Sequence, residues 1–181
     1  SGFGDRMLQQ STAQHIQSLA KVTYTSMYQL MNQGWKREQV VAFADNVANS
    51  VVGTPLKIDF HRSEVVSGQY GAVRVASSDS AVEQAMKTGL RLDSTTPDGM
   101  RFLLPMKANK ECLSCHTNAK KDDVLGVIEI RAGYEELIGE TRGLVFSGAF
   151  NADIAPINPR TKVDGVGGVP YLVIPVAANG G

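Results

Sequence analysis

Cysteine and histidine are scarce in this chain of 181 residues, and that scarcity excludes several classes of protein. Only two cysteines and three histidines occur. Two cysteines cannot build the disulfide framework of a small secreted scaffold. Two of the histidines, His15 and His61, lack the paired spacing that would complete a zinc site.

Net charge and long apolar runs are also missing. The 18 lysines and arginines balance 18 aspartates and glutamates, so the composition favours neither nucleic acid nor an anionic membrane as a partner. No apolar run reaches the length of a transmembrane helix, and no signal peptide is present. The start, Ser-Gly-Phe-Gly, is typical of a processed or recombinant end, so residues 1–10 are expected to be an end segment or disordered.

The chain does contain the pentapeptide Cys112-Leu113-Ser114-Cys115-His116, which holds both cysteines. C-x-x-C-H is the attachment sequence of a c-type haem: two thiols add to the porphyrin vinyl groups, and the adjacent imidazole binds the iron. Two intervening residues let one turn of backbone reach both vinyl groups. The sequence therefore predicts one covalent haem c on Cys112 and Cys115, with His116 as a metal ligand. Because haem c is attached outside the cytoplasm, we expect an exported chain whose signal or anchor lies outside these residues.

Zinc and a redox dithiol are the two alternatives for this motif. Structural zinc takes four ligands, usually in two spaced pairs, and His116 is too close to Cys115 to act as an independent ligand. A thioredoxin-like C-x-x-C begins a helix after a strand within a βαβ unit. Residues 101–106 do have a strand pattern, but the linker 107–111 is polar and no βαβ pattern surrounds it. Haem is favoured over both alternatives.

Hydrophobic periodicity predicts two helices followed by a sheet. Apolar residues recur at helical spacing from about Ser11 to Gln33 and again from about Arg37 to Asn49, which indicates an αα-hairpin. A capping box at Ser80–Glu83 predicts a short helix, and another helix is expected at 134–142. Strands are predicted at 56–60, 70–75, 90–92, 101–105 and 124–131. These elements indicate an α+β, sensor-like domain, neither a doubly wound sheet nor an all-helical cytochrome c.

Several stretches together carry a family resemblance. They are Tyr24–Met27, Gly53–Ile58, Arg62, Tyr70-Gly71, Pro105–His116 and Val124–Ile130. With them, the chain from Ala20 to Leu137 resembles the haem c sensor domains of PAS-like fold in the periplasmic parts of bacterial chemotaxis receptors, histidine kinases and diguanylate cyclases. The resemblance implies a PAS-like antiparallel sheet with an N-terminal helical hairpin over residues 11–142, a periplasmic location, a homodimer and a signalling output domain. Residues 143–181 lie outside it and are expected to form a C-terminal extension, so any membrane connection would need a segment that this chain lacks.

The second axial position on the iron decides the chemistry. A thioether ligand suits electron transfer or redox sensing, whereas an open position can bind NO, CO or O2. Met27 is the first candidate, because it matches the Tyr-x-x-Met helix of the resembling family, and Met31 is the second. The further candidates are His61, Met86, Met100 and Met106. Haem propionates need cationic or hydrogen-bonding partners, for which Arg62 and Arg101 are the first candidates.

These features predict a periplasmic sensor module that responds to redox state or to a diatomic gas, and not an enzyme. The alternative is a monohaem c-type cytochrome that carries electrons to a redox partner. A peroxidase would need a distal acid–base group, and no distal His or Arg can be assigned.

Overall fold

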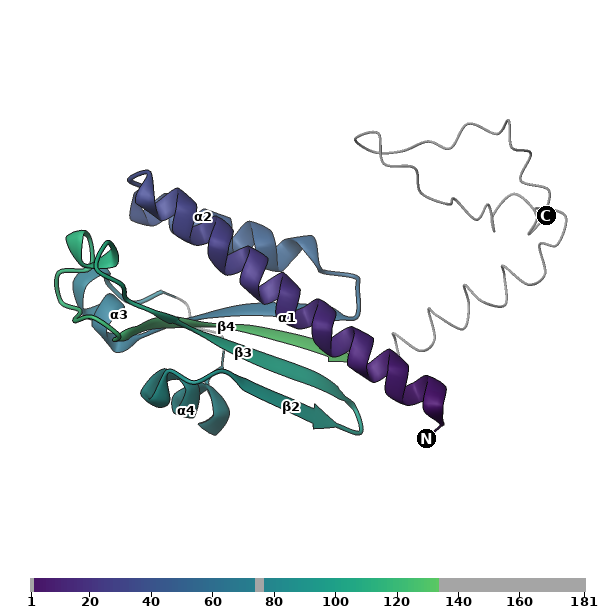
Figure 1. Cartoon of the computed structure of the whole chain (residues 1–181). Coiled ribbons are helices and arrows are strands. Elements are labelled where there is room, and N and C mark those ends of the chain that lie inside the picture. Colours follow the sequence, from purple (N-terminus) through teal and green to yellow (C-terminus); the bar gives the residue numbers. More distant parts are fainter. Residues whose placement is uncertain (1, 74–76, 134–181) are drawn as a thin grey trace, which may run out of the picture. The chain divides into compact units, whose positions relative to one another are not determined.

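An antiparallel sheet of four strands organises the residues that the computed structural model describes, 2–73 and 77–133 (Figure 1). The strand order is β1-β4-β3-β2. The strands are β1 Leu56–Arg62, β2 Leu92–Thr96, β3 Gly99–Lys107 and β4 Val124–Gly133. The helices are α1 Phe3–Asn32, α2 Arg37–Ser50, α3 Glu64–Tyr70 and α4 Ser80–Thr88, with a 3₁₀ turn η1 at Cys112–Ser114. The expected α+β class with an antiparallel sheet is confirmed.

The sheet is covered by helices on both faces. Val127 and Leu103 form a buried cluster with Val82 and Ala85 of α4 on one face. Since strand side chains alternate, Ile128 and its neighbours lie on the other face, which α1 crosses in Figure 1. Each fully buried Ile, Leu or Phe side chain contributes about 1.5–3 kcal/mol to the free energy of unfolding. The residues of that second face include Ile58, Phe102, Ile128 and Ile130, all at most 2% exposed.

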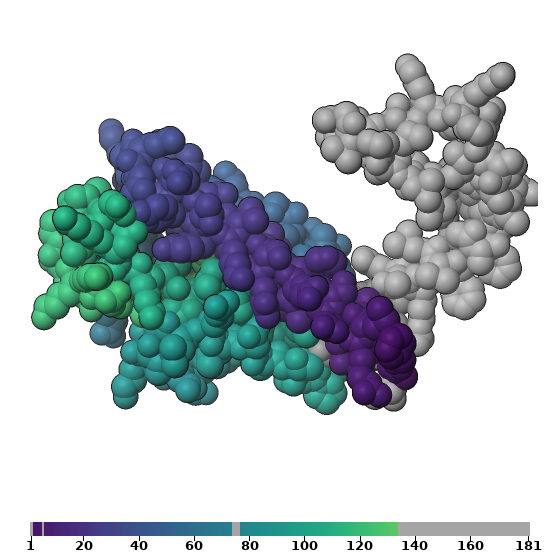
Figure 2. All heavy atoms as spheres, viewed as in Figure 1, coloured from purple at the N-terminus to yellow at the C-terminus, as the bar shows by residue number. Residues whose placement is uncertain are grey.

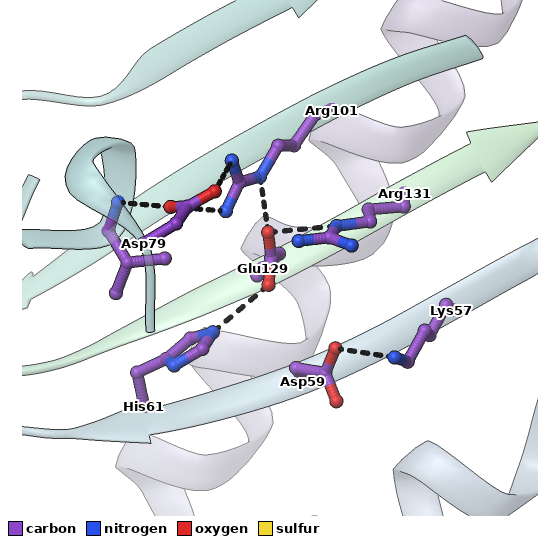
Figure 3. Close-up of polar contacts among 8 residues, drawn as sticks. Lys57, Asp59, His61, Asp79, Arg101, Glu129 and Arg131 are labelled. Atoms are coloured by element: carbon purple, nitrogen blue, oxygen red, sulfur yellow. Dashed lines mark hydrogen bonds and ion pairs between the residues drawn. The ribbon is translucent and has the colours of Figure 1, made fainter. Parts of the chain in front are cut away.

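A charged cluster interrupts the face of the sheet that α4 covers (Figure 3). Glu129, in the middle of β4, is 1% exposed. Its carboxylate accepts hydrogen bonds from His61 Nε2 at 3.0 Å, from Arg131 Nε at 3.1 Å and from Arg101 Nε. Arg101 also donates to Asp79 at 2.7 Å and 3.0 Å. Because a buried carboxylate is costly without partners, this cluster makes each of its members dependent on the others.

Helix α1 begins eight residues before the predicted start at Ser11, so residues expected to be an end segment lie in its first turns. Residues 3–10 contain no proline, and Met7, Leu8 and the two glutamines that follow are good helix formers. A helix already nucleated by its packed part propagates through such residues at little cost. No helix in the described part of the chain is long and apolar enough to cross a membrane.

The strand predicted at 70–75 is wrong over the described residues 70–73, because Tyr70 ends helix α3 and residues 71–73 form no strand. Ser63 caps this helix by accepting a hydrogen bond from Val66 N, and Gly71 follows it with φ +85°. Residues 74–76 lie outside the described residues. The cap of α4 is Asp79, whose carboxylate accepts from Val82 N at 3.1 Å, and not Ser80.

Strand β2 occupies residues 92–96, where a strand at 90–92 was predicted, and the turn at Pro97-Asp98 joins it to β3 as an antiparallel pair. The chain divides into a unit of residues Ser1–Tyr134 and a second unit of Glu135–Gly181. The helix predicted at 134–142 and the extension at 143–181 lie outside the described residues.

Candidate haem site

A cavity of about 930 Å³ lies between α1, α2, β1, α3 and the segment that carries the Cys-x-x-Cys-His motif. Cys112, Cys115 and His116 all line it, and so do Met27 and Met31 from α1. The fold therefore brings together five side chains that lie up to 89 positions apart in the sequence. Cavities that bind small molecules and cofactors have volumes of about 300–1,000 Å³ and mostly apolar linings.

One face of α1 supplies its wall of the cavity. Tyr24, Met27, Tyr28 and Met31 all line the cavity, at the spacing that places residues on a single helix face. Met27 is 5% exposed.

The other candidates for the second axial position separate into two groups. Met106 and His61 also line the cavity, but His61 Nε2 is engaged by Glu129. Met86 packs against the α4 cluster and Met100 is buried in β3, and neither lines the cavity. The geometry therefore leaves Met27, Met31 and Met106 as the thioethers on the cavity wall.

The motif itself forms one tight turn. The backbone N–H groups of Cys115 and His116 both donate to Cys112 O, at 3.2 Å and 2.9 Å. Asn109 Oδ1 accepts from Cys112 N at 3.0 Å and so fixes where the turn begins. Both thiols are free, with Cys112 partly buried and Cys115 exposed. Such a turn is what we expect where two residues separate cysteines that must both reach one porphyrin.

Side chains of two helices hold this turn in place. Tyr28 of α1 donates its hydroxyl hydrogen bond to Glu111 Oε2 at 2.7 Å, and Asn109 Nδ2 donates to the same hydroxyl at 2.8 Å. At the other end, Gln69 Nε2 donates to Cys115 O at 2.7 Å, and the hydroxyl of Tyr70 donates to the same carbonyl. Figure 2 shows the C-terminal part of α1 against the green segment that carries the motif. The sequence offers no signal for these contacts, because they join positions about 45 to 83 residues apart.

His116 lies partly buried on the cavity wall. Its Nδ1 is buried and has no hydrogen-bond partner among the described residues, and its ring meets Tyr70 edge to face at 5.5 Å. Burial, followed by the nearby charge of Arg62, lowers the pKa of the imidazole. A neutral imidazole is the form that binds a metal. A buried polar atom without a partner is uncommon and calls for a functional explanation.

The residues of the cavity fit a c-type haem. Two free thiols and an imidazole lie on one short turn, and thioethers and aromatic rings line the same cavity. No three His, Cys, Asp or Glu side chains gather as a metal-binding group within the described ranges. An iron held by a porphyrin needs only one or two protein ligands, so haem does not require such a group. Arg62 lines the cavity, whereas Arg101 is held by Asp79 and Glu129.

Replacing Tyr28 by phenylalanine is expected to lower the free energy of unfolding by about 1 kcal/mol, because both hydrogen bonds of its hydroxyl are lost while the ring stays. Tyr24→Phe is the matched control, since no hydrogen bond joins the hydroxyl of Tyr24 to another described residue. Urea unfolding of the haem-free chain measures both. Equal losses in the two variants would show that Tyr28 does not hold the motif.

Comparison with known proteins adds no family to these observations. No family model matches the chain, and no curated protein matches it either. The function therefore has to be inferred from the cavity and from the residues that line it.

Proposed function

We propose that this chain is a periplasmic haem c sensor module of PAS-like fold that responds to redox state or to a diatomic gas, and that it is not an enzyme. One haem is attached through Cys112 and Cys115, with His116 as the proximal ligand. The observation that carries the proposal is the cavity of about 930 Å³, which Cys112, Cys115 and His116 line together with Met27 and Met31 of α1. The order β1-β4-β3-β2 of an antiparallel sheet with helices on its faces is consistent with a PAS-like fold.

The bound haem supplies an iron that changes oxidation state or takes up NO, CO or O2. Met27 is the proposed distal ligand, because it is the more deeply buried of the two α1 methionines on the cavity wall. Because Met27 lies on α1, a change of ligand or oxidation state at the iron would shift the conformational equilibrium of this helix. The helix is connected to the site at two points, through Met27 and through the contact of Tyr28 with Glu111. A change in ligation at Met27 would therefore alter the position of a helix of 30 residues.

An alternative is a monohaem cytochrome that carries electrons to a redox partner. The surface position of Cys115 favours it, because a thioether at that residue would bring one porphyrin edge close to solvent. Fast electron exchange with no change of axial ligand would support this alternative over sensing.

Met27→Ala is expected to convert a six-coordinate haem into one that binds CO, because the variant removes the distal thioether. Met31→Ala, one helical turn away on the same cavity wall, is the control and should leave the coordination unchanged. Absorption spectra of the oxidised and reduced proteins, with and without CO, measure both. If Met27→Ala leaves the spectra and the CO reaction as in the wild type, Met27 is not the ligand. Rapid CO binding by the wild type would favour gas sensing over redox sensing.

A further inference from the structure

Two arginines on the wall of the cavity have no acidic partner among the residues that the structure describes. Arg37 begins α2 and Arg62 ends β1, and both line the cavity. The ion pairs among the described residues involve Lys57, His61, Arg101 and Arg131, and neither cavity arginine. Glu38 and Asp45 of α2 line the same cavity but pair with neither arginine.

The backbone after α3 holds both guanidinium groups. Arg62 Nη1 donates to Gly71 O at 2.9 Å, and Arg37 Nη2 donates to Ala72 O at 3.5 Å. Gly71 has φ +85°, a conformation that favours glycine. Since the two carbonyls belong to consecutive residues, this turn gathers two positive side chains from different elements. Each guanidinium has five N–H donors, so most of them stay available to a ligand.

The pair places two positive charges on one part of the cavity wall. Burial and the charge of Arg37 lower the pKa of Arg62, as expected for like charges held together. After burial, the charge of Arg62 also lowers the pKa of His116, which lines the same cavity. Two guanidinium groups that repel each other are stabilised when a carboxylate or another anion binds between or beside them.

We propose that Arg37 and Arg62 bind the two propionate carboxylates of the haem. The inference rests on the proposed function, and it adds a binding role for Arg37 and a paired role for Arg62. The propionates are the charged groups of a haem, and the rest of the cavity wall contains many apolar and aromatic side chains that suit the macrocycle. Planar guanidinium groups match carboxylates in a bidentate geometry.

The haem-loaded protein gives the first test. In the double variant Arg37→Gln, Arg62→Gln, the loss of positive charge favours the oxidised iron. We expect the equilibrium between oxidised and reduced protein to shift about tenfold, which corresponds to a midpoint potential lower by about 59 mV for one electron. Arg91→Gln is the control, because Arg91 is exposed and does not line the cavity. A potential within error of the wild type in the double variant would overturn the proposal.

The second test separates a propionate contact from a general effect of charge. The haem-free chain is titrated with haem and with haem dimethyl ester, whose propionates are neutral. We expect the wild type to prefer haem by about tenfold and the double variant to lose that preference, with Arg91→Gln behaving as the wild type. Equal binding of both compounds by the wild type, or an unchanged preference in the double variant, would overturn the proposal.

Different results would contradict the proposed function and the arginine pair. A wild-type chain that takes up neither compound and carries no covalent haem after export would remove both. A wild-type chain that carries covalent haem but shows neither difference would remove the arginine pair alone. Circular dichroism and the absorption spectrum of each variant show that the fold and the haem are retained. The single variants Arg37→Gln and Arg62→Gln give the same comparison should the double variant not fold.

Discussion

Replacing both thiols, Cys112→Ser with Cys115→Ser, is expected to abolish all haem that stays on the chain after denaturation. The haem content of the denatured protein should fall from about one per chain to none, because only the two thioether bonds survive unfolding. His116 remains in the variant, so haem bound without covalent attachment is released by the denaturant. Haem staining after denaturing electrophoresis measures the difference.

Ser114→Ala is the matched control for this experiment, because Ser114 lies between the cysteines and its hydroxyl donates only locally, to Glu111 O at 2.8 Å and weakly to the sulfur of Cys115. It should keep the haem content of the wild type. Retention of haem by the double variant through denaturation would contradict attachment at these two residues. A wild type without haem would contradict the proposed function as a whole.

Glu129→Gln is expected to lower the free energy of unfolding by about 3 kcal/mol, because it leaves His61, Arg101 and Arg131 facing a neutral amide at a buried position. Asp59→Asn is the matched control: Asp59 lies opposite Glu129 in the register of β1 and β4, but its partner Lys57 is 66% exposed. Solvent-exposed ion pairs contribute about 0–1 kcal/mol to the free energy of unfolding. Urea unfolding measures both, and similar losses in the two variants would contradict the importance of burial.

The same carboxylate makes stability depend on pH. Burial raises the pKa of Glu129, but the hydrogen bond from His61 and the charges of Arg101 and Arg131 outweigh burial and lower the pKa from 4.5 to about 2. A lowered folded-state pKa stabilises the fold above the ordinary value and not below it. The contribution is therefore present in full above about pH 4.5 and is lost as the pH falls toward 2. Glu129→Gln should flatten that part of the unfolding profile, and an unchanged slope would contradict this assignment.

The sequence predicts the long elements well, because their patterns are long. The hairpin of α1 and α2 and the central strands β3 and β4 follow from sustained periodicity. Helix α3 was missed because seven residues with Val65, Val66 and Gly68 have weak helix propensity. Its helical form depends on the cap at Ser63 and on burial of Val66, which a local pattern does not reveal.

The site was predictable in its chemistry and not in its surroundings. Cys112, Cys115 and His116 follow from their spacing, whereas Tyr28, Gln69 and Arg37 act through contacts that only the fold creates. Glu129 did leave a signal, since it is a charged residue within the strongly β-forming run Val127-Ile128-Glu129-Ile130. A charge in the middle of such a strand indicates a buried partner.

The intact mass of the wild-type chain, exported from a bacterium that attaches haem c, tests the central claim most directly. We predict a mass increased by that of one haem, with both thiols blocked and visible absorption retained after unfolding. A chain of unmodified mass, with Cys112 and Cys115 free to react with a thiol reagent, would contradict the assignment of this cavity to a covalent haem.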